Sequence, residues 1–417
     1  MIAMSGIHKS VLAGLAMTAL AGLSPAAAET LNALFMAQAA YSDADVKAMT
    51  AAFEKENPGV TVNAEFVPYE ALYDKIVASK AAGGAGYDVV LYDVIWPAAF
   101  AQNGVLVDVT DRLKDLDRSQ VFDGAWATVN YDGKTYGMPW ILDTKYLFYN
   151  TEILEKAGIA TPPKTWDELA TDAKIIKDKG LVQYPIVWSW SQAEAVICDY
   201  VTLTAAYGGK FFEADKPVFD KGGSLDAVTY MADSLKNGLS NPNSKEYLEE
   251  DVRKVFSAGD AAFALNWTYM YAKANDPAES KVVGKVGVVP APGVEGKSTA
   301  SGVNGSMGLG ITAGSTKPDL AWKYIVYLTS KPVQNQYAKL SLPIWKASYS
   351  DPAVTKGQEA LVKAADVSIG LMTPRPTVAS YQELSTILQA QIQNALAGKA
   401  SPADALAAAA KDAARIR

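Results

Sequence analysis

Five segments between residues 30 and 93 alternate between strand and helix patterns, and this alternation limits the fold more than any other feature. Three of them, 30–37, 60–68 and 87–93, are short apolar or alternating runs typical of strands. The two between, 42–59 and 69–83, have helical spacing; Ser42 suits an N-cap, and the first pattern ends at an Asn-Pro-Gly turn. Repeated strand–helix–strand units predict an α/β fold, with a parallel sheet covered by helices on its faces.

Similar signals recur further along the chain. Thr165 and Glu168 have the spacing of a capping box, and the helix that they begin should stop at Lys179-Gly180. Ser401 followed by Pro402 predicts the start of a C-terminal helix. A chain of 417 residues is long for one domain, and no low-complexity linker divides it. We therefore expect two α/β lobes without a flexible tether.

The first 28 residues have the pattern of a secretory signal. His8 and Lys9 precede an apolar run over residues 11–23, and Ala26 and Ala28 have the spacing that a signal peptidase recognises. Cleavage is expected before Glu29. The run is short for a membrane span. The alternative to a signal is that this segment forms a buried N-terminal helix. No cysteine stands at the junction to carry a lipid, so we expect a protein free in the periplasm of a Gram-negative cell.

Composition excludes several classes of function. The only histidine, His8, leaves with the signal, which excludes histidine acid–base chemistry, Ser-His-Asp triads and histidine metal sites. The only cysteine, Cys198, can form no intramolecular disulfide, and its apolar helical context predicts a buried, inert thiol. Loss of Lys9 changes the net charge from −7 to −8, which disfavours nucleic acid and anionic membranes as partners.

Two motifs could suggest a nucleotide site or a calcium site, but each has a simpler structural explanation. The glycines of "SGVNGSMGLGI" (301–311) do not have the spacing of a dinucleotide loop, and no helix follows them directly. Asp43 and Asp45 are ordinary acids at a helix start, since a calcium loop needs more ligands and a glycine. A catalytic pair of carboxylates depends on distance in three dimensions, so the sequence leaves that alternative open. We expect no cofactor and no metal.

Aromatic residues meet amides and acids just after several predicted strands, which is the pattern that most favours a binding site. Ligands of open α/β sheets bind outside the carboxyl ends of the strands. Sugars suit such a mixture, because their C–H faces pack on aromatic rings and their hydroxyls need planar donors and acceptors. The segments concerned are "YDVIWP" (92–97), "MPWILDTKYLFYN" (138–150), "WSWSQ" (188–192), "LNWTYMY" (265–271) and "TPRPTVASY" (373–381).

The chain resembles the extracellular sugar-binding proteins of bacterial ABC importers, the family 1 group that includes the maltose-binding protein. The resemblance covers nearly the whole mature chain and rests on "AFEKENPGVTV", "YDVVLYDVIWPAAFAQNGVLVDVTD", "YGMPWILDTKYLFYN", "PPKTWDEL" and "GVVPAPG". It implies two lobes, 29–140 plus 290–341 and 141–289 plus 342–417. It places the hinge passages of the chain near 137–142, 289–292 and 342–345.

The resemblance also implies where the ligand binds. Arg375 suggests a ligand with an acidic group, although arginine bridges neutral hydroxyls equally well. Within "VWSWSQ" (187–192) we expect Trp188 to pack against its lobe and Trp190 to serve as the platform for a sugar ring. The residues assigned to the ligand are Gln38, Tyr41, Ser42, Asp93, Trp96, Asp143, Trp188, Trp190, Gln192, Asn266, Trp267, Thr268, Gly302, Val303, Asn304 and Arg375.

The function that follows is capture of a carbohydrate (a mono- or disaccharide or a sugar derivative) between two lobes, without chemistry. The expected partners are inner-membrane permease subunits with a cytoplasmic ATPase, and the protein itself should be a monomer. A periplasmic carbohydrate-active enzyme that uses carboxylates, or a binder of a non-sugar solute, is the alternative. An aromatic cage with acids would favour an amine.

Overall fold

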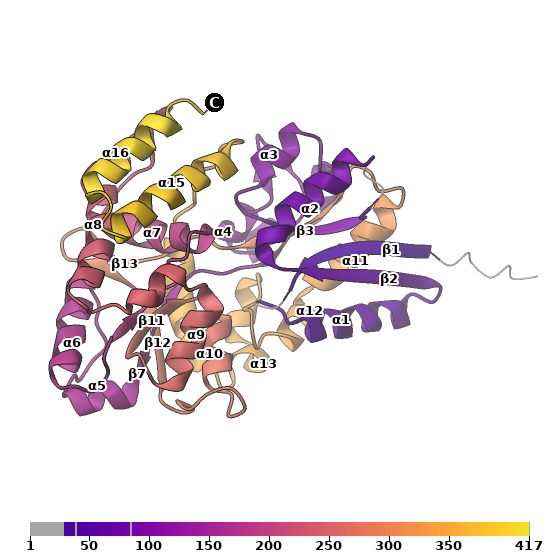
Figure 1. The fold of residues 1–417 in the computed structure, drawn as a ribbon. Coiled ribbons are helices and arrows are strands. Elements are labelled where there is room, and N and C mark those ends of the chain that lie inside the picture. Colours follow the sequence, from indigo (N-terminus) through magenta and orange to yellow (C-terminus); the bar gives the residue numbers. More distant parts are fainter. Residues whose placement is uncertain (1–28, 38–39, 84–85, 417) are drawn as a thin grey trace, which may run out of the picture.

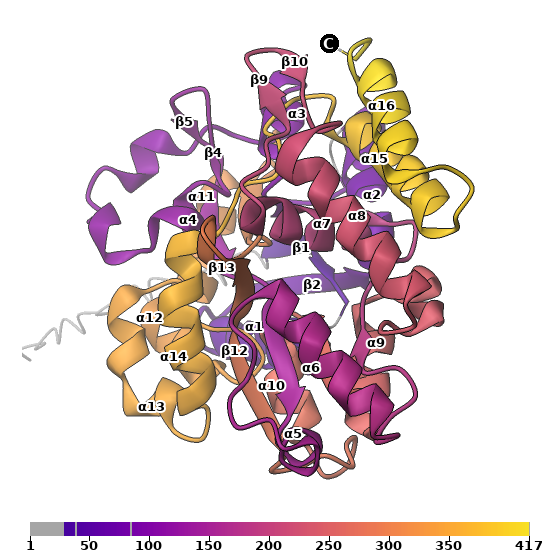
Figure 2. The same ribbon diagram turned by 90° about the vertical axis from the view of Figure 1, so that its left-hand side faces the viewer.

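A computed structural model describes residues 29–37, 40–83 and 86–416. The predicted signal lies outside the described residues. The chain forms two lobes, each built on a five-stranded sheet, with helices around both sheets (Figures 1 and 2).

The sheet of the first lobe has the strand order β2-β1-β3-β14-β6. Strand β1 is parallel to both β2 and β3, as the alternation of strands and helices predicts. Strand β14 is antiparallel to both of its neighbours, so the prediction of a wholly parallel sheet is wrong there. The strands are β1 (Glu29–Met36), β2 (Val60–Val67), β3 (Val89–Asp93), β6 (Met138–Ile141) and β14 (Met307–Ile311).

The sheet of the second lobe is mostly antiparallel, with the order β13-β12-β7-β11-β8. Only β11 and β8 run parallel. The expectation of parallel sheets therefore fails here as well, because β7 arrives from the other lobe rather than through a helical crossover. The strands are β7 (Tyr146–Asn150), β8 (Ile186–Val187), β11 (Phe263–Asn266), β12 (Val286–Val294) and β13 (Ser298–Ser301).

The helices begin and end for reasons visible in their caps. Ser42 and Asp45 form a capping box at the start of α1, and Thr165 and Glu168 form one at α6. Ser401 caps α16, whose first residue is Pro402. The helices are α1 (Asp43–Glu56), α2 (Tyr69–Ala81), α3 (Pro97–Gln102), α4 (Asp123–Trp126), α5 (Thr151–Ala157), α6 (Trp166–Asp178), α7 (Glu194–Ala206), α8 (Gly222–Lys236), α9 (Glu249–Ala258), α10 (Tyr269–Ala274), α11 (Pro318–Thr329), α12 (Lys331–Gln336), α13 (Pro352–Thr355), α14 (Glu359–Ser368), α15 (Tyr381–Leu396) and α16 (Pro402–Ala413).

Short elements complete the fold. Two hairpins, β4–β5 and β9–β10, stand apart from the main sheets. Their strands are β4 (Asn130–Tyr131), β5 (Lys134–Thr135), β9 (Phe212–Glu213) and β10 (Lys216–Pro217). The 3₁₀ helices are η1 (Thr110–Leu113), η2 (Arg118–Gln120), η3 (Pro242–Glu246), η4 (Lys346–Ser350) and η5 (Ile369–Leu371). None of these short elements belongs to either five-stranded sheet.

Helix α7 is buried along almost its whole length in the second lobe. It contacts α8 and β13, and α15 packs against it as well. Its apolar residues therefore face neighbours on several sides rather than along one stripe. Cys198 lies in this helix with its thiol buried, which confirms the prediction, and burial raises the pKa of the thiol.

The chain passes between the lobes at three places. The first passage joins β6 to β7 over residues 142–145, just past the expected position. The second lies at 302–306, between β13 and β14, whereas the expected position, 289–292, is inside β12. Residues 342–345, expected as the third passage, still contact the first lobe, because Trp345 forms a bridge with Val121. The third passage therefore lies further along the chain, before α14, and α14 packs on β12 of the second lobe.

Candidate functional site

A cavity of about 240 Å³ lies between the two lobes. Strands β1, β3 and β6 of the first sheet end at it, and antiparallel β14 begins there. The second lobe contributes the start of α7, the start of α9 and the residues after β11. The lining comprises Met36, Ala37, Ala40, Pro68, Tyr69, Glu70, Asp93, Ile141, Asp143, Glu194, Ala195, Cys198, Leu248, Glu249, Glu250, Trp267, Tyr269, Gly305, Met307 and Arg375.

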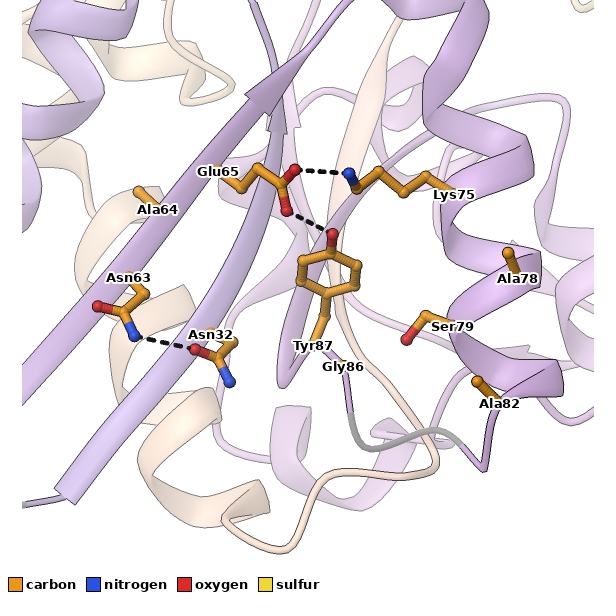
Figure 3. A pocket seen from close by; sticks show the side chains of 10 residues that line it. All are labelled: Asn32, Asn63, Ala64, Glu65, Lys75, Ala78, Ser79, Ala82, Gly86 and Tyr87. Atoms are coloured by element: carbon orange, nitrogen blue, oxygen red, sulfur yellow. Dashed lines mark hydrogen bonds and ion pairs between the residues drawn. The ribbon is translucent and has the colours of Figure 1, made fainter.

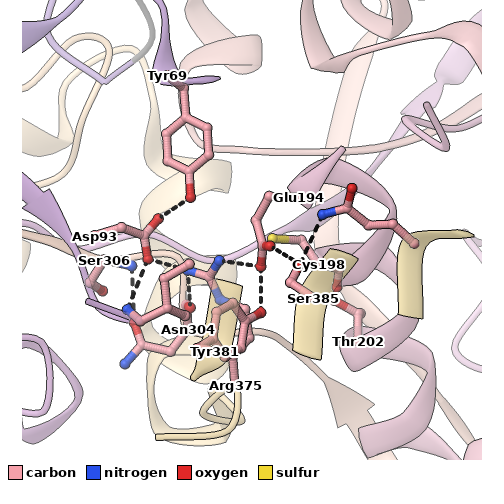
Figure 4. Close-up of polar contacts among 12 residues, drawn as sticks. Tyr69, Asp93, Glu194, Cys198, Thr202, Asn304, Ser306, Arg375, Tyr381 and Ser385 are labelled. Carbon is pink, nitrogen blue, oxygen red and sulfur yellow. Dashed lines mark hydrogen bonds and ion pairs between the residues drawn. The ribbon is translucent and has the colours of Figure 1, made fainter. Parts of the chain in front are cut away.

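Arg375 links the lobes at this cavity. Its Nη2 donates to Asp93 Oδ1 at 2.6 Å, and its Nη1 donates to Glu194 Oε1 at 2.8 Å (Figure 4). Asp93 belongs to β3 of the first lobe and Glu194 to α7 of the second. Burial raises the pKa of Asp93, and the guanidinium only partly offsets this. Arg375 is therefore committed to two carboxylates of the protein.

Glu194 is held by hydroxyl groups as well as by the arginine. Tyr381 Oη donates to its Oε1 at 2.5 Å, and Ser385 Oγ donates to its Oε2 at 2.6 Å (Figure 4). Both donors come from α15. The C-terminal helices thus fix a side chain of the cavity wall.

Lys145 is fully buried and lies over the ring of Trp267, which lines the cavity. Its Nζ donates to Asp199 Oδ1 at 2.6 Å and to Ser189 Oγ at 2.8 Å. It also lies 3.3 Å from Glu249 Oε1 and 5.0 Å from the centre of the Trp267 ring. Burial alone would lower the pKa of this ammonium, but Asp199 and Glu249 raise it overall.

Asp143 stands on the first passage between the lobes. Its Oδ1 accepts from Thr268 Oγ1 at 2.6 Å and from the backbone N–H of Thr144 at 2.9 Å. Burial raises the pKa of Asp143 to about 7, although these hydrogen bonds oppose the shift. The side chain is therefore poised to be either a donor or an acceptor near neutral pH.

Four of the residues predicted for the site line the cavity: Asp93, Asp143, Trp267 and Arg375. Three more stand directly behind its wall. Asn266 donates to Glu249 O, Thr268 to Asp143, and Asn304 O accepts from Arg375. Gly302 and Val303 are buried in the second passage without lining the cavity.

The other predicted residues do not line the cavity. Tyr41 is buried and stacks on Trp140 at 4.7 Å, while Ser42 caps α1. Trp96 is buried against Tyr69, and Gln192 is exposed. Gln38 lies outside the described residues.

Trp188 and Trp190 stack on each other inside the second lobe, with ring centres 4.8 Å apart and both side chains fully buried. Trp188 Nε1 donates to Ser240 Oγ at 2.7 Å, in keeping with the expectation that it packs in the lobe. Trp190 was expected as a sugar platform, but α15 covers it: Gln393 donates to its carbonyl. Strand β8 ends at Val187, and the backbone N–H of Trp190 donates to Ser244 O at 2.9 Å, which fixes the segment after the strand against η3.

Sequence reasoning missed Tyr69, Lys145, Glu194 and Glu249, whereas Tyr269 lies in the segment "LNWTYMY" (265–271) that the sequence singles out. Tyr69 begins α2 directly after β2, and Glu194 and Glu249 begin α7 and α9. An acid in the first turn of a helix has an ordinary explanation in the helix dipole, so these glutamates gave no distinct signal.

A second hollow, of about 520 Å³, lies on the first lobe beside β1, β2 and α2 (Figure 3). Its charged side chains are paired with each other: Glu65 accepts from Tyr87 at 2.5 Å and contacts Lys75 at 2.6 Å. Its lining is Asn32, Asn63, Ala64, Glu65, Lys75, Ala78, Ser79, Ala82, Gly86 and Tyr87. Although larger, it involves only one lobe, so the cavity between the lobes is the better candidate.

Within residues 29–37, 40–83 and 86–416, no group of three or more His, Cys, Asp or Glu side chains is arranged to hold a metal ion. Across the same described residues, no helix combines the length and the apolar character needed to cross a membrane.

Comparisons with known proteins agree with this architecture. A family model described as bacterial extracellular solute-binding protein matches residues 37–335. A probable ABC transporter-binding protein of Deinococcus radiodurans is 29% identical over 375 residues, which cover 86% of this chain and 87% of that protein.

Solved structures show the same fold. MalE3 of T. maritima, with maltose bound, has a TM-score of 0.86 at 30% identity and covers 93% of this chain and 99% of its own. A solute-binding protein of Agrobacterium radiobacter K84 in complex with ribitol has a TM-score of 0.84 at 26% identity, covering 94% and 100%. The chain therefore belongs to the bacterial extracellular solute-binding proteins of ABC transporters, a family that binds solutes and does not transform them.

Proposed function

We propose that this protein captures a small carbohydrate, a mono- or disaccharide or sugar derivative, between its lobes in the periplasm. It then delivers the ligand to inner-membrane permease subunits that work with a cytoplasmic ATPase. The observation that carries the proposal is the cavity between the lobes, in which Tyr69, Trp267 and Tyr269 stand beside polar side chains. Aromatic faces and planar polar groups are what a sugar needs from a binding site.

Similar proteins support the ligand class. Besides the structures with maltose and ribitol, a solute-binding protein of Thermotoga lettingae was solved with α-D-tagatose at 27% identity. Ligand pockets commonly measure about 300–1,000 Å³. A cavity of about 240 Å³ favours a small sugar or polyol over an oligosaccharide.

The geometry explains how capture works without chemistry. Walls from both lobes enclose the cavity, so a ligand touches both walls only when the lobes are closed. Ligand binding then favours the closed form over the open form. A permease can recognise that form as the loaded state.

A thermal-shift screen tests the ligand class. The panel contains neutral sugars, polyols, amino sugars, acidic sugars and simple amines. A ligand at about 100 times its dissociation constant adds roughly 2.7 kcal/mol to the free energy of unfolding. We expect at least one carbohydrate or polyol to raise the melting temperature; if only a non-sugar does so, the proposed ligand class is overturned.

Location and oligomeric state need separate measurements. We expect the protein in the fraction released by osmotic shock, with an intact mass corresponding to a chain that begins at Glu29. Light scattering after size exclusion should give the mass of a monomer. A retained N-terminal segment would contradict the predicted cleavage.

A further inference from the structure

Two clusters of charged groups beside the cavity each contain one cation and two carboxylates. In the first, Arg375 contacts Asp93 at 2.6 Å and Glu194 at 2.8 Å. In the second, Lys145 contacts Asp199 at 2.6 Å and Glu249 at 3.3 Å. With both carboxylates ionised, each cluster carries one negative charge more than its cation neutralises.

Burial strengthens the interaction of these excess charges with a charged ligand. The side chains of the Arg375 cluster are 1%, 6% and 10% exposed; in the other cluster Lys145 and Asp199 are fully buried and Glu249 is 21% exposed. Charges away from water interact strongly and are little screened by salt. Of the other carboxyl groups in the lining, Glu250 is paired with Arg253 at 2.6 and 2.8 Å, Asp143 has a pKa raised to about 7, and Glu70 is exposed. The excess charge therefore resides in the two clusters. The cavity is thus an environment of negative potential.

The cations of both clusters are already paired with carboxylates of the protein, and the one Arg375 nitrogen without a partner, Nε, is buried. Arg375 directs both terminal nitrogens at carboxylates, and Nη2 also donates to Asn304 O. Lys145 directs its ammonium at Asp199, Ser189 and Glu249. The expectation that Arg375 grips an acidic group therefore does not fit its contacts.

The three aromatic side chains of the lining are each tied to a carboxylate. Tyr69 Oη donates to Asp93 at 3.0 Å, and Trp267 Nε1 donates to Glu249 at 3.2 Å. Tyr269 Oη lies 3.5 Å from Glu250 Oε2. A ring face beside a carboxylate attracts a cation through both groups.

From these contacts we infer that the captured solute carries a positive charge. Resting on the proposed carbohydrate function, the ligand class is an amino sugar or an amino polyol. Its ammonium neutralises the excess charge of the clusters, and its hydroxylated part occupies the remainder of the cavity.

Matched probes test the charge separately from the carbohydrate. One set is glucose, glucosamine and glucuronate; the other is sorbitol, 1-amino-1-deoxysorbitol and gluconate. Titration calorimetry should show the amine of at least one set bound about tenfold or more tightly than its neutral partner, and the acid most weakly. Equal binding of amine and neutral forms in every set that binds, or preference for an acid, overturns the inference while leaving the carbohydrate function intact.

Choline serves as a cation without a sugar. If choline binds and none of the sugar or polyol probes does, the carbohydrate function is overturned and the positive charge is supported. If neither choline nor any probe of either set binds, both proposals are overturned.

A substitution in the Lys145 cluster tests whether that cluster causes the preference for an amine over a neutral ligand. Glu249→Gln removes one excess charge, and we expect the ratio of amine to neutral affinity to fall at least about fivefold. The ratio is the readout because loss of a support for Trp267 would weaken both ligands equally. Glu155→Gln, an exposed change on α5 away from the cavity lining, is the matched control and should leave the ratio unchanged. An unchanged ratio in Glu249→Gln contradicts the inference.

Discussion

At the scale of single residues, the surroundings of each tryptophan decide its role. Trp267 is partly buried at the cavity, with Nε1 bonded to Glu249, whereas Trp190 is fully buried beneath α15. Both follow short strands, which is why the sequence predicted the same role for them. Arg375 lies between η5 and α15, whereas position at or just after the end of a strand was sufficient to find Asp93, Asp143 and Trp267. It could not reveal that a helix near residue 390 covers Trp190.

Alanine at each of these two tryptophans should give opposite results. Trp190→Ala leaves a large hole in a packed core and is expected to lower the free energy of unfolding by about 3–5 kcal/mol. Trp267→Ala should cost less stability but weaken binding of the solute found in the thermal screen at least about tenfold. Urea denaturation and titration calorimetry measure the two quantities. Unchanged affinity in Trp267→Ala would show that its ring is only structural.

Asp143 should make stability fall as pH rises. Burial raises its pKa to about 7 in the folded protein, against about 3.9 in an unfolded chain. The folded state therefore holds a proton that the unfolded state releases, so stability decreases between about pH 4 and 7. Asp143→Asn should flatten this slope and be more stable above pH 7, by roughly 4 kcal/mol at most.

Urea denaturation across this pH range checks the prediction for Asp143. The exposed substitution Asp215→Asn is the control and should keep the slope of the parent protein. A slope that Asp143→Asn leaves unchanged would mean that this carboxyl group is not the one responsible.

At the scale of elements, local signals predicted the helices well and the strands less well. Capping boxes at α1 and α6 depend on residues three positions apart, so the sequence contains them completely. Strand β12 contains Pro290 and Pro292, which normally argue against a central strand. It nevertheless pairs with β7 and then with the edge strand β13. Residues 286–294 form a strand despite the two prolines because β7, far away in the sequence, pairs with residues 286–290.

Helix α6 offers a matched test of capping. Thr165 Oγ1 accepts from the backbone N–H of Glu168 at 3.1 Å, so Thr165→Ala should cost about 1 kcal/mol of stability. Thr171 is exposed in the same helix, and its hydroxyl only donates to Asp167 O. Thr171→Ala should be near neutral or slightly stabilising. Equal losses in the two variants, measured by urea denaturation, would contradict a role for the cap.

At the scale of the whole molecule, the lobes meet where the passages of the chain lie beside the cavity. Gly305, on the second passage, donates its N–H to Asp143 O on the first at 3.0 Å. A β-carbon at Gly305 would stand 2.4 Å from Cη2 and Cζ3 of Trp267. The approach of the two lobes therefore depends on a missing side chain.

Gly305→Ala should hinder closure. We expect ligand affinity to fall about tenfold, because the added methyl displaces Trp267 from its place in the cavity wall. Gly370→Ala is the control, since no heavy atom lies within 4 Å of its added β-carbon. Calorimetry gives the affinities, and X-ray scattering with and without ligand reports closure. Full affinity and full compaction in Gly305→Ala would refute this account.

Strand β14 has a consequence for the time at which the protein can fold. It lies between β3, which ends at residue 93, and β6, which ends at residue 141, yet it begins only at Met307. The first sheet therefore cannot be completed on the ribosome until most of the chain has been synthesised. Pairing between segments so distant in sequence is slow. This late strand therefore postpones completion of the first lobe, although three of its strands are synthesised early.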